Sequence, residues 1–552
     1  MEQAPSATPP IAPAALGRSG GFLWLAVFLA GVATLGIEMV ASRLLAPYFG
    51  TSQPIWAVII GLTLIYLAVG YGLGGRLADR HPDESLLYSI IMAAALATVI
   101  IPLIAQPILR FSQGSIATLA VGSFLGALFG VLLLFAIPII LLAMVGPFAI
   151  RILLRHATDG IAAAGTTAGT ISAVSTIGSI IGTFLTVLYL IPTIGTARTT
   201  VLFAVLLALV AAVGLASRRA VAGLVLTLVI ALGAISGVGT VKAAGCTGCE
   251  LIAERESAYN YIQVAERQHP LLGLQTALVL NEGFAVHSFY NQRYTQTGDP
   301  RDLLSRGGPW DYFAVAPYFV ADRTPAHVTS LAMLGSAAGT IPAQFLAIYG
   351  ADTTIDAVEI DPAIIDVGRT YFAMRDATIA PEHPNYRVYA EDARTWLALN
   401  GGSYDVIGMD AYHQPYIPFH LTTVEFFTLV SQHLADDGVA VVNAGLGPDG
   451  DDRLSVAIGI TMRRVFPHVY VIDTANFGNQ ILVGVKERDD NGLQHFIDNY
   501  HAIDDPTLRA IMETVVAREF DPQTTTYQPF TDDHAPVEAL IDSLIYKIVS
   551  ER

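Results

Sequence analysis

Apolar runs that end in carboxylates are the features of this sequence best suited to chemistry. The run 328–334 is followed by the turn Gly335-Ser-Ala-Ala-Gly339, and the run 355–358 ends in Glu359 and Asp361. In a strand, turn, helix and strand unit, small residues let the backbone approach a ligand, and the acid ending the second strand accepts hydrogen bonds from two ribose hydroxyls. The pattern predicts a site for a nucleoside-containing cofactor. Packing of the two glycines is the alternative interpretation.

The same pattern recurs twice further along the chain. The run 386–389 leads into Asp392, and the run 404–409 leads into Asp410. Three successive predicted strands therefore each end in a carboxylate.

The surrounding pattern predicts an α/β domain preceded by a small β unit. From 250 to about 322 alternation dominates, with a hairpin around Asn281-Glu282-Gly283. After Asp410, the predicted elements are helix 422–434, strand 439–443, helix 453–466 and two strands that pair antiparallel, 469–472 and 480–485. Five parallel strands closed by an antiparallel pair form a Rossmann-like domain, the architecture of class I adenosylmethionine-dependent enzymes.

The N-terminal half has the composition of a helical membrane domain. Up to Cys249 there are eleven Lys and Arg against six Asp and Glu, a balance of +5. The remainder has nineteen against forty-one, a balance of −22, and the two sum to the −17 of the whole chain. Crossing a bilayer takes roughly 20 apolar residues. Seven runs are long enough: 21–46, 54–77, 86–109, 116–142, 168–192, 198–216 and 221–241.

The sequence is consistent with either side of the membrane for the soluble half. If the N-terminus is cytoplasmic, seven spans place six arginines inside, as the positive-inside rule prefers: Arg76, Arg80, Arg151, Arg155, Arg218 and Arg219. The same count places the soluble half outside, whereas an adenosyl cofactor is expected in the cytosol. Either 116–156 crosses twice, with 143–156 as an eighth element, or the soluble half is extracytoplasmic. Cys246 and Cys249 could form a short disulfide or be two free thiols.

Several partners are disfavoured by the sequence. The soluble half lacks basic clusters, so we expect no nucleic acid. The single CxxC pair has no second pair or nearby His, so we expect no metal. Two charges within the first span, Glu38 and Arg43, are either functional groups facing the bundle interior or structural partners on neighbouring helices.

A series of segments in the soluble half resembles the polyamine synthases, the spermidine and spermine synthase family of aminopropyltransferases. In order, these segments are ESAYNYIQV, the hairpin, LGSAAGT, AVEIDPAIIDVGRTYF, EDARTWL and YDVIGMDAYHQPYIPFHLTTVEFF. The resemblance covers roughly 250–490, and the apolar N-terminal half is similar to the branch of that family fused to membrane helices. The family transfers an aminopropyl group from decarboxylated adenosylmethionine to an amine.

The resemblance implies a role for individual positions. Glu359 matches the acid that holds the ribose, and Asp392 the acid beside the adenine amino group. Asn260 stands where the family usually has a Gln that contacts the nucleoside. Asp410 matches the aspartate that deprotonates or positions the attacking amine, and Tyr312 falls on the tyrosine lining the substrate site. With Gly335, Gly339 and Asp361 of the turn unit, these residues make up the expected site.

Three positions depart from the family pattern. Ala338, Ala314 and His413 stand where the family usually has carboxylates that face cationic amines. Ordinary putrescine aminopropylation is therefore not the simplest expectation, because a buried ammonium without a partner is costly. His413 could be a base near pH 7 or only line the pocket. Gln414, Tyr416 and His420 could line a less charged acceptor site, and Gln and Tyr in such a loop are as often surface residues.

These observations together predict an integral membrane protein, of the cell (inner) membrane, with a tail at 1–20 and about seven spans in 21–245. A small β subdomain at 250–325 and a spermidine-synthase-type domain at 326–552 follow. The expected function is aminopropyl transfer to a small-molecule amine from decarboxylated adenosylmethionine or adenosylmethionine, and the chain could form a homo-oligomer. The alternatives are methyl transfer, cleavage releasing methylthioadenosine, or a non-catalytic nucleoside- or polyamine-binding or transport-linked membrane protein.

Overall fold

The computed structural model describes 18–49, 53–116, 122–156, 164–236, 249–269, 273–281, 285–400, 402–412, 416–475, 478–487, 491–524 and 527–550. The chain divides into two compact units. The first comprises 1–43, 58–108 and 130–239, and the second comprises 44–57, 109–129 and 240–552. Each unit is described by itself below.

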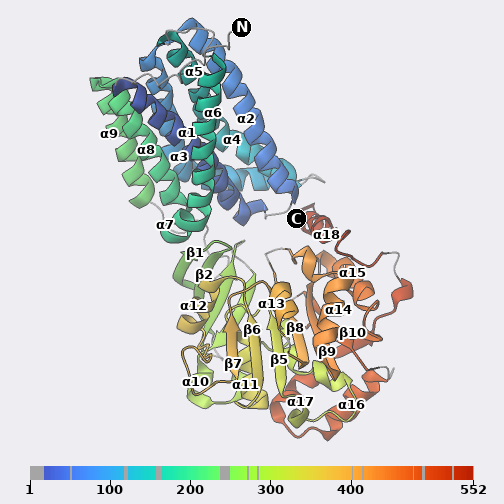
Figure 1. The fold of residues 1–552 in the computed structure, drawn as a ribbon. Helices are drawn as coiled ribbons and strands as arrows, with labels where there is room; N and C mark the ends of the chain where they lie inside the picture. The colour runs from blue at the N-terminus through green and yellow to red at the C-terminus, as the bar shows by residue number, and fades with distance from the viewer. Residues whose placement is uncertain are drawn as a thin grey trace, which may run out of the picture. The chain divides into compact units, whose positions relative to one another are not determined.

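Helices, most of them long and apolar, make up the N-terminal part of the chain (Figure 1). They are α1 (Arg18–Phe49), α2 (Gln53–Arg80), α3 (Glu84–Ile116), α4 (Gly122–Ala143), α5 (Val145–His156), α6 (Ala164–Leu185), α7 (Ile191–Ile194), α8 (Thr196–Leu215) and α9 (Arg218–Ser236). Among the described residues, seven segments are long and apolar enough to cross a membrane. This agrees with the seven predicted spans. The candidate eighth element, 143–156, continues the fourth segment, which runs from Leu125 to Arg155.

Glycines four residues apart bring helices of this unit into close contact, as small residues do in membrane proteins. A Cβ added at Gly178 would lie 2.3 Å from the carbonyl oxygen of Phe28, and one at Gly182 would lie 2.1 Å from that of Val32. Both glycines are in α6 and both carbonyls in α1. No side chain larger than hydrogen fits at these two positions without moving α1.

The soluble part begins with the expected small β unit. Its antiparallel sheet has the order β1-β2-β3-β4, formed by β1 (Glu250–Glu256), β2 (Tyr261–His269), β3 (Gly273–Leu280) and β4 (Val286–Asn291). The strands β3 and β4 form the predicted hairpin, and part of its turn lies outside the described residues.

An eight-stranded mixed sheet follows, in the order β12-β10-β11-β9-β8-β5-β6-β7 (Figure 1). Its strands are β5 (Ser330–Leu334), β6 (Thr354–Val358), β7 (Tyr386–Tyr389), β8 (Tyr404–Met409), β9 (Leu434–Gly445), β10 (His468–Asp473), β11 (Asn479–Val485) and β12 (Val516–Glu519). The strands β7, β6, β5, β8 and β9 are parallel, and β11 and β10 are antiparallel, as predicted. The edge strand β12 was not predicted, because its four residues, VARE, carry no apolar alternation.

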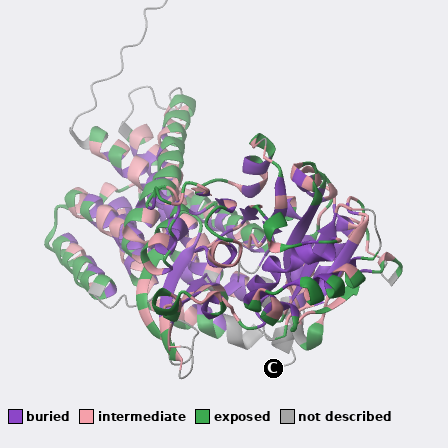
Figure 2. Ribbon diagram, turned by 90° about the horizontal axis from the view of Figure 1, so that it is seen from below, coloured by how far each residue is buried: buried purple, intermediate pink, exposed green. Residues whose placement is uncertain are grey.

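Two apolar cores cover the two faces of this sheet, and the central strands between them are mostly buried (Figure 2). Alternation along β5 assigns Leu331 and Met333 to one core and Ala332 and Leu334 to the other. The helices around the sheet are α11 (Thr340–Tyr349), α12 (Pro362–Tyr371), α13 (Ala393–Leu399), α14 (Val424–His433), α15 (Arg453–Met462), α16 (Gly492–Ala502), α17 (Pro506–Met512) and α18 (Val537–Ser550).

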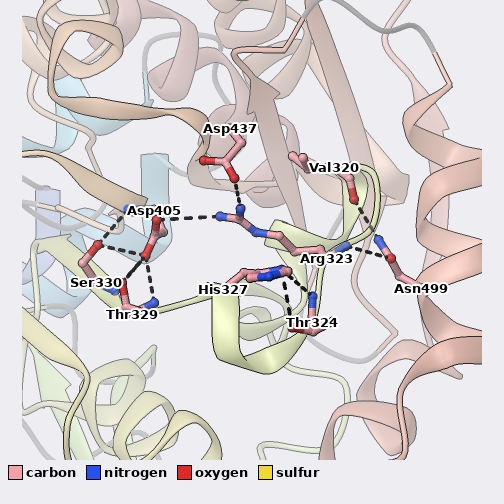
Figure 3. Close-up of polar contacts among 9 residues, drawn as sticks. All are labelled: Val320, Arg323, Thr324, His327, Thr329, Ser330, Asp405, Asp437 and Asn499. Atoms are coloured by element: carbon pink, nitrogen blue, oxygen red, sulfur yellow. Dashed lines mark hydrogen bonds and ion pairs between the residues drawn. The ribbon is translucent and has the colours of Figure 1, made fainter.

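Polar contacts fix the amino edge of the sheet, opposite to the predicted site. The buried Arg323 pairs with Asp437, and Asp405 accepts from the backbone amides of Thr329 and Ser330 across 2.8 and 3.0 Å (Figure 3). Asp405 lies in β8 and Ser330 begins β5, so these bonds set the register of the two central strands. The register in turn places Leu334 opposite Met409, just before Gly335 and Asp410.

Candidate active site at the carboxyl edge of the sheet

The glycine turn after β5 has a conformation that requires glycine. Gly335 and Gly339 have φ values of +83° and +93°, in the left-handed region. A Cβ added at Gly335 would lie 2.5 Å from the Cα of Ala411, so the turn touches the backbone that follows β8. Both glycines are therefore needed by the backbone itself, and the same close approach brings the turn next to Asp410.

Glu359 lies at the end of β6 and points at the glycine turn. It is only 8% exposed and accepts hydrogen bonds from the backbone amides of Ala337 and Asp361, both across 3.0 Å. Burial raises the pKa of Glu359 to about 7. A buried carboxylate beside a turn of backbone amides is well placed to accept hydrogen bonds from vicinal hydroxyls.

Asp361 makes structural contacts at the start of α12. Its carboxylate caps α12 by accepting from the Ala363 amide across 3.0 Å, and it also accepts from Ser257 and from the Asn260 side chain, the latter across 3.0 Å. Asn281 donates to Asn260 across 2.9 Å. Asp361 is fully buried and both of its oxygens accept hydrogen bonds, so it joins the β unit to α12. Asn260 belongs to the same network.

Asp392 follows β7 and caps α13 through the Thr395 amide, 2.9 Å from Oδ1. Its Oδ2 lies 3.0 Å from Nε2 of His420. The hydrogen bond with His420 lowers the pKa of Asp392, so this carboxylate is ionised at neutral pH. It is partly exposed, so its carboxylate is a hydrogen-bond acceptor at the end of β7.

Asp410 lies directly after β8 and is surrounded by neutral or basic groups. Asn443, near the end of β9, donates to Asp410 Oδ1 across 2.9 Å. Burial raises the pKa of Asp410 to about 6, against the opposing effects of the Asn443 hydrogen bond, the nearby His287 and a hydrogen bond from Trp310. A carboxyl group that titrates near pH 6 is a suitable general base for a proton released by an amine.

Tyr312 is not brought to Asp410. It is fully buried in one of the two cores, and its hydroxyl accepts from Thr514 across 3.4 Å. Trp310, two residues earlier in the same 3-10 helix (Pro309–Ala314), is the aromatic residue that reaches Asp410. The predicted tyrosine is therefore a core residue in this structure.

The predicted acceptor loop is only partly described. His413 and Gln414 lie outside the described residues. Tyr416 is buried and donates to Asp542 of α18 across 2.6 Å, which ties the end of the loop to the C-terminal helix. Ala338 and Ala314, the two alanines at family acid positions, are buried in two different apolar clusters.

An apolar pocket adjoins Asp410 on one side. The described residues that line it are Leu334, Met409, Ala411, Tyr412, Ile417, Leu421, Thr422, Phe426, Phe427, Val442, Asn443 and Ile458. No charged side chain is among them, and Asn443 is shared between the pocket and Asp410. No group of three His, Cys, Asp or Glu residues that could hold a metal occurs in the described part of the chain.

Three residues at this site were missed by sequence reasoning. His287 lies on β4, Trp310 in a 3-10 helix and Asn443 on β9, and each is far from Asp410 in the sequence. A signal existed only for Asn443, which ends an apolar strand as Glu359, Asp392 and Asp410 follow theirs. Nothing in the sequence around His287 or Trp310 separates them from other residues of the β unit.

Comparison with known proteins finds similarity to polyamine aminopropyl transferases. Residues 342–476 match the family described as "Spermine/spermidine synthase domain". A probable polyamine aminopropyl transferase of Bifidobacterium longum is 32% identical over 318 residues, which is 54% of this chain and 64% of the relative. A polyamine aminopropyltransferase of Vibrio vulnificus is 36% identical over 114 residues, 20% of this chain and 36% of the relative. The chain thus spans less than two thirds of the length of either relative.

Two spermidine synthases are among the solved structures that match part of this chain. A probable spermidine synthase from Corynebacterium glutamicum is 22% identical with a TM-score of 0.39, covering 51% of this chain and 96% of the other. The spermidine synthase of Thermotoga maritima is 16% identical with a TM-score of 0.35, covering 48% of this chain and 84% of the other.

Proposed function

We propose that the C-terminal half, in which residues 342–476 match the spermine/spermidine synthase domain, transfers an aminopropyl group from decarboxylated adenosylmethionine to a small amine. The observation that carries the proposal is the environment of Asp410. This carboxyl group follows the central strand β8, titrates near pH 6, and is held by Asn443 beside the glycine turn.

The donor would be held by the carboxylates on the neighbouring strands. Glu359 would accept the ribose hydroxyls, and Asp392, ionised and partly exposed, would accept the adenine amino group. These two acids end β6 and β7, whereas Asp410 ends β8 on the other side of β5. The nucleoside and the reacting carbon of the donor would thus have separate parts of one edge of the sheet.

The reaction itself would need little beyond positioning and one base. The amine nitrogen attacks the propyl carbon next to the sulfonium, the carbon–sulfur bond breaks, and its electrons remain on sulfur as neutral methylthioadenosine. The new carbon–nitrogen bond leaves the amine with a surplus proton, which Asp410 accepts. A sulfonium is already a good leaving group, so holding the nitrogen about 3 Å from the carbon is the main task.

Methyl transfer from adenosylmethionine is a second candidate on the same fold. Ala338 and Ala314 stand where the family usually has carboxylates, so neither position supplies a carboxylate to a cationic amine. Both alanines are also buried within apolar clusters. Methyl transfer does not need such acids.

The products distinguish the two reactions. The purified, detergent-solubilised chain is incubated with adenosylmethionine or its decarboxylated form, with and without a panel of amines, and the products are identified by mass spectrometry. Aminopropyl transfer predicts methylthioadenosine and an amine heavier by one aminopropyl group, only with the decarboxylated donor and an acceptor. Adenosylhomocysteine would indicate methyl transfer, methylthioadenosine without acceptor would indicate cleavage, and no product with the native chain would refute catalysis. The Asp410→Asn variant is the matched control for contaminating enzymes.

A further inference from the structure

We infer that the soluble transferase domain lies on the side of the membrane opposite to the cytoplasm. This inference goes beyond the proposed reaction and does not depend on it. It rests on the direction of the helices, the distribution of arginines and the state of Cys249.

The first step concerns the segment Leu125–Arg155, which decides whether the number of crossings is odd or even. Where this segment contacts α2, the residue numbers increase together along the two segments. A Cβ added at Gly70 would lie 2.5 Å from the carbonyl oxygen of Ile140, and one at Gly74 would lie 2.7 Å from the Cα of Met144.

The same order continues to the ends of the two segments. Arg151 pairs with Asp79 across 3.2 Å, and Arg155 donates to the carbonyl oxygen of Pro82 across 3.2 Å. Two helices whose contacts increase together in residue number run in the same direction. Since α2 crosses once, the segment Leu125–Arg155 also crosses once, and the described helices make seven crossings.

The second step concerns which side is cytoplasmic. With seven crossings, the end of α2, the end of α5 and the start of α9 lie on one side, and these three ends carry six arginines: Arg76, Arg80, Arg151, Arg155, Arg218 and Arg219. Arg18, at the start of α1, lies on the same side. The opposite helix ends have three: Arg43, Arg110 and Arg198. Short connections rich in Lys and Arg stay in the cytoplasm. The arginine-rich side is therefore cytoplasmic, and α9, which starts there, ends on the other side at Ser236.

The third step concerns the connection to the soluble domain. Only the 12 residues 237–248 separate the end of α9 from Cys249. This is too short for another crossing, which takes roughly 20 residues. The domain that begins with β1 therefore stays on the side where α9 ends.

The state of Cys249 agrees with this side. Cys249 is disulfide-bonded, and the only other cysteine of the sequence, Cys246, lies outside the described residues. Disulfides persist in oxidising compartments and are rare in the cytosol. It follows that the donor and the acceptor of the proposed reaction would be met outside the cytoplasm, so the donor would have to be exported to that side.

Site-directed thiol labelling tests the inference on the full chain. In a Cys246→Ser, Cys249→Ser background, one variant carries Leu399→Cys, at a position of the soluble domain that is 80% exposed. The other carries Ser217→Cys, in the exposed connection between α8 and α9. Bacterial spheroplasts that express each variant are treated with a membrane-impermeant maleimide before and after permeabilisation, which also verifies that each thiol is reactive.

The expected result is that Leu399→Cys reacts in intact spheroplasts and Ser217→Cys reacts only after permeabilisation. The reverse pattern, or the same behaviour at both positions, would overturn the inference. In the native chain, mass spectrometry after alkylation should show two added groups only when the protein is first reduced. Alkylation of both cysteines without reduction would contradict the oxidising location. Neither measurement requires turnover, so both remain informative if the proposed reaction is wrong.

Discussion

Asn443 donates its side-chain amide to Asp410 across 2.9 Å, and Asn479 donates in turn to the Asn443 side-chain oxygen across 2.9 Å. This chain of two amides fixes the donor end of Asn443 toward the carboxylate. A hydrogen bond to a charged group contributes roughly 1.5 to 3 kcal/mol. Asn443 therefore favours the ionised form of Asp410, which is the form that can accept a proton.

Asn443→Ala should shift the pH dependence of turnover. Loss of a donor to the charged form raises the pKa of Asp410, by about one unit if the lost bond is worth about 1.4 kcal/mol. The acid limb of the kcat/KM profile should move upward in pH, with a smaller loss of rate at pH 8 than at pH 6. Asn479→Ala, which keeps the direct bond to Asp410, is the control and should shift the limb less. An unmoved limb in Asn443→Ala would show that this amide does not act on the base.

The native chain should itself lose activity in acid with a midpoint near pH 6. Burial raises the pKa of Asp410 to about 6, so the carboxyl group is protonated and unable to act as a base below that pH. The rate should rise with pH through this value and then level off, as measured by methylthioadenosine release at saturating donor. A rate that is constant between pH 5 and 8 would exclude Asp410 as the titrating base.

Asp410→Asn should retain donor binding and lose turnover. The amide has the size of the carboxyl group but cannot accept the proton, and removal of a positioned base typically costs 10²- to 10⁴-fold. Calorimetry with methylthioadenosine should give a Kd within about threefold of the native value, a difference of about 0.7 kcal/mol. Native-like turnover by the Asp410→Asn variant would mean that another group takes the proton.

Glu359→Ala and Asp392→Ala should each abolish nucleoside binding in calorimetry. Both remove an acceptor at the proposed donor site, but both also remove hydrogen bonds to backbone amides. Asp366→Ala is the matched control, because this carboxylate is on the same α/β unit and its side chain is 58% exposed. Among the ion pairs described, its only partner is the exposed Arg255. Thermal unfolding of each variant separates loss of binding from loss of fold. Unchanged affinity in both site variants would refute the assignment of the donor site.

The strands and their carboxylates could be predicted from the sequence because each is a local pattern. The runs before Glu359, Asp392 and Asp410 are short and apolar, and the structure places all three acids at the carboxyl ends of parallel strands. The role of Asp361 could not be predicted, since its partners Ser257 and Asn260 come from the β unit about 100 residues earlier. An aspartate at that position suits both a helix cap and a ligand-binding acid, so the residue type does not distinguish the two roles.

Stability measurements should confirm the structural role of Asp361. Asp361→Ala removes a helix cap, worth about 1 kcal/mol, and leaves the buried Ser257 and Asn260 without their acceptor, which costs about 1 to 3 kcal/mol for each group. The variant should therefore unfold at a clearly lower denaturant concentration than the native chain. Asp361→Asn, which keeps one acceptor oxygen, should lose less. If Asp361→Ala were as stable as the native chain but failed to bind the nucleoside, the original expectation for Asp361 would be restored.

Trp310 and Tyr312 offer the most direct comparison between the resemblance and the geometry. The resemblance assigns substrate contact to Tyr312, whereas the structure buries Tyr312 beside Thr514 and hydrogen-bonds Trp310 to Asp410. Trp310→Phe keeps an aromatic ring and removes the donor, so kcat should fall by about tenfold, equivalent to about 1.4 kcal/mol, and the acid limb should move upward. Tyr312→Phe removes a buried hydroxyl whose described hydrogen bond is with Thr514, so kcat and the acid limb should stay within about twofold and a few tenths of a pH unit of the native values. If Tyr312→Phe lowered kcat and shifted the acid limb while Trp310→Phe did neither, Tyr312 would be the residue that acts at the site, and Trp310 would serve only in packing.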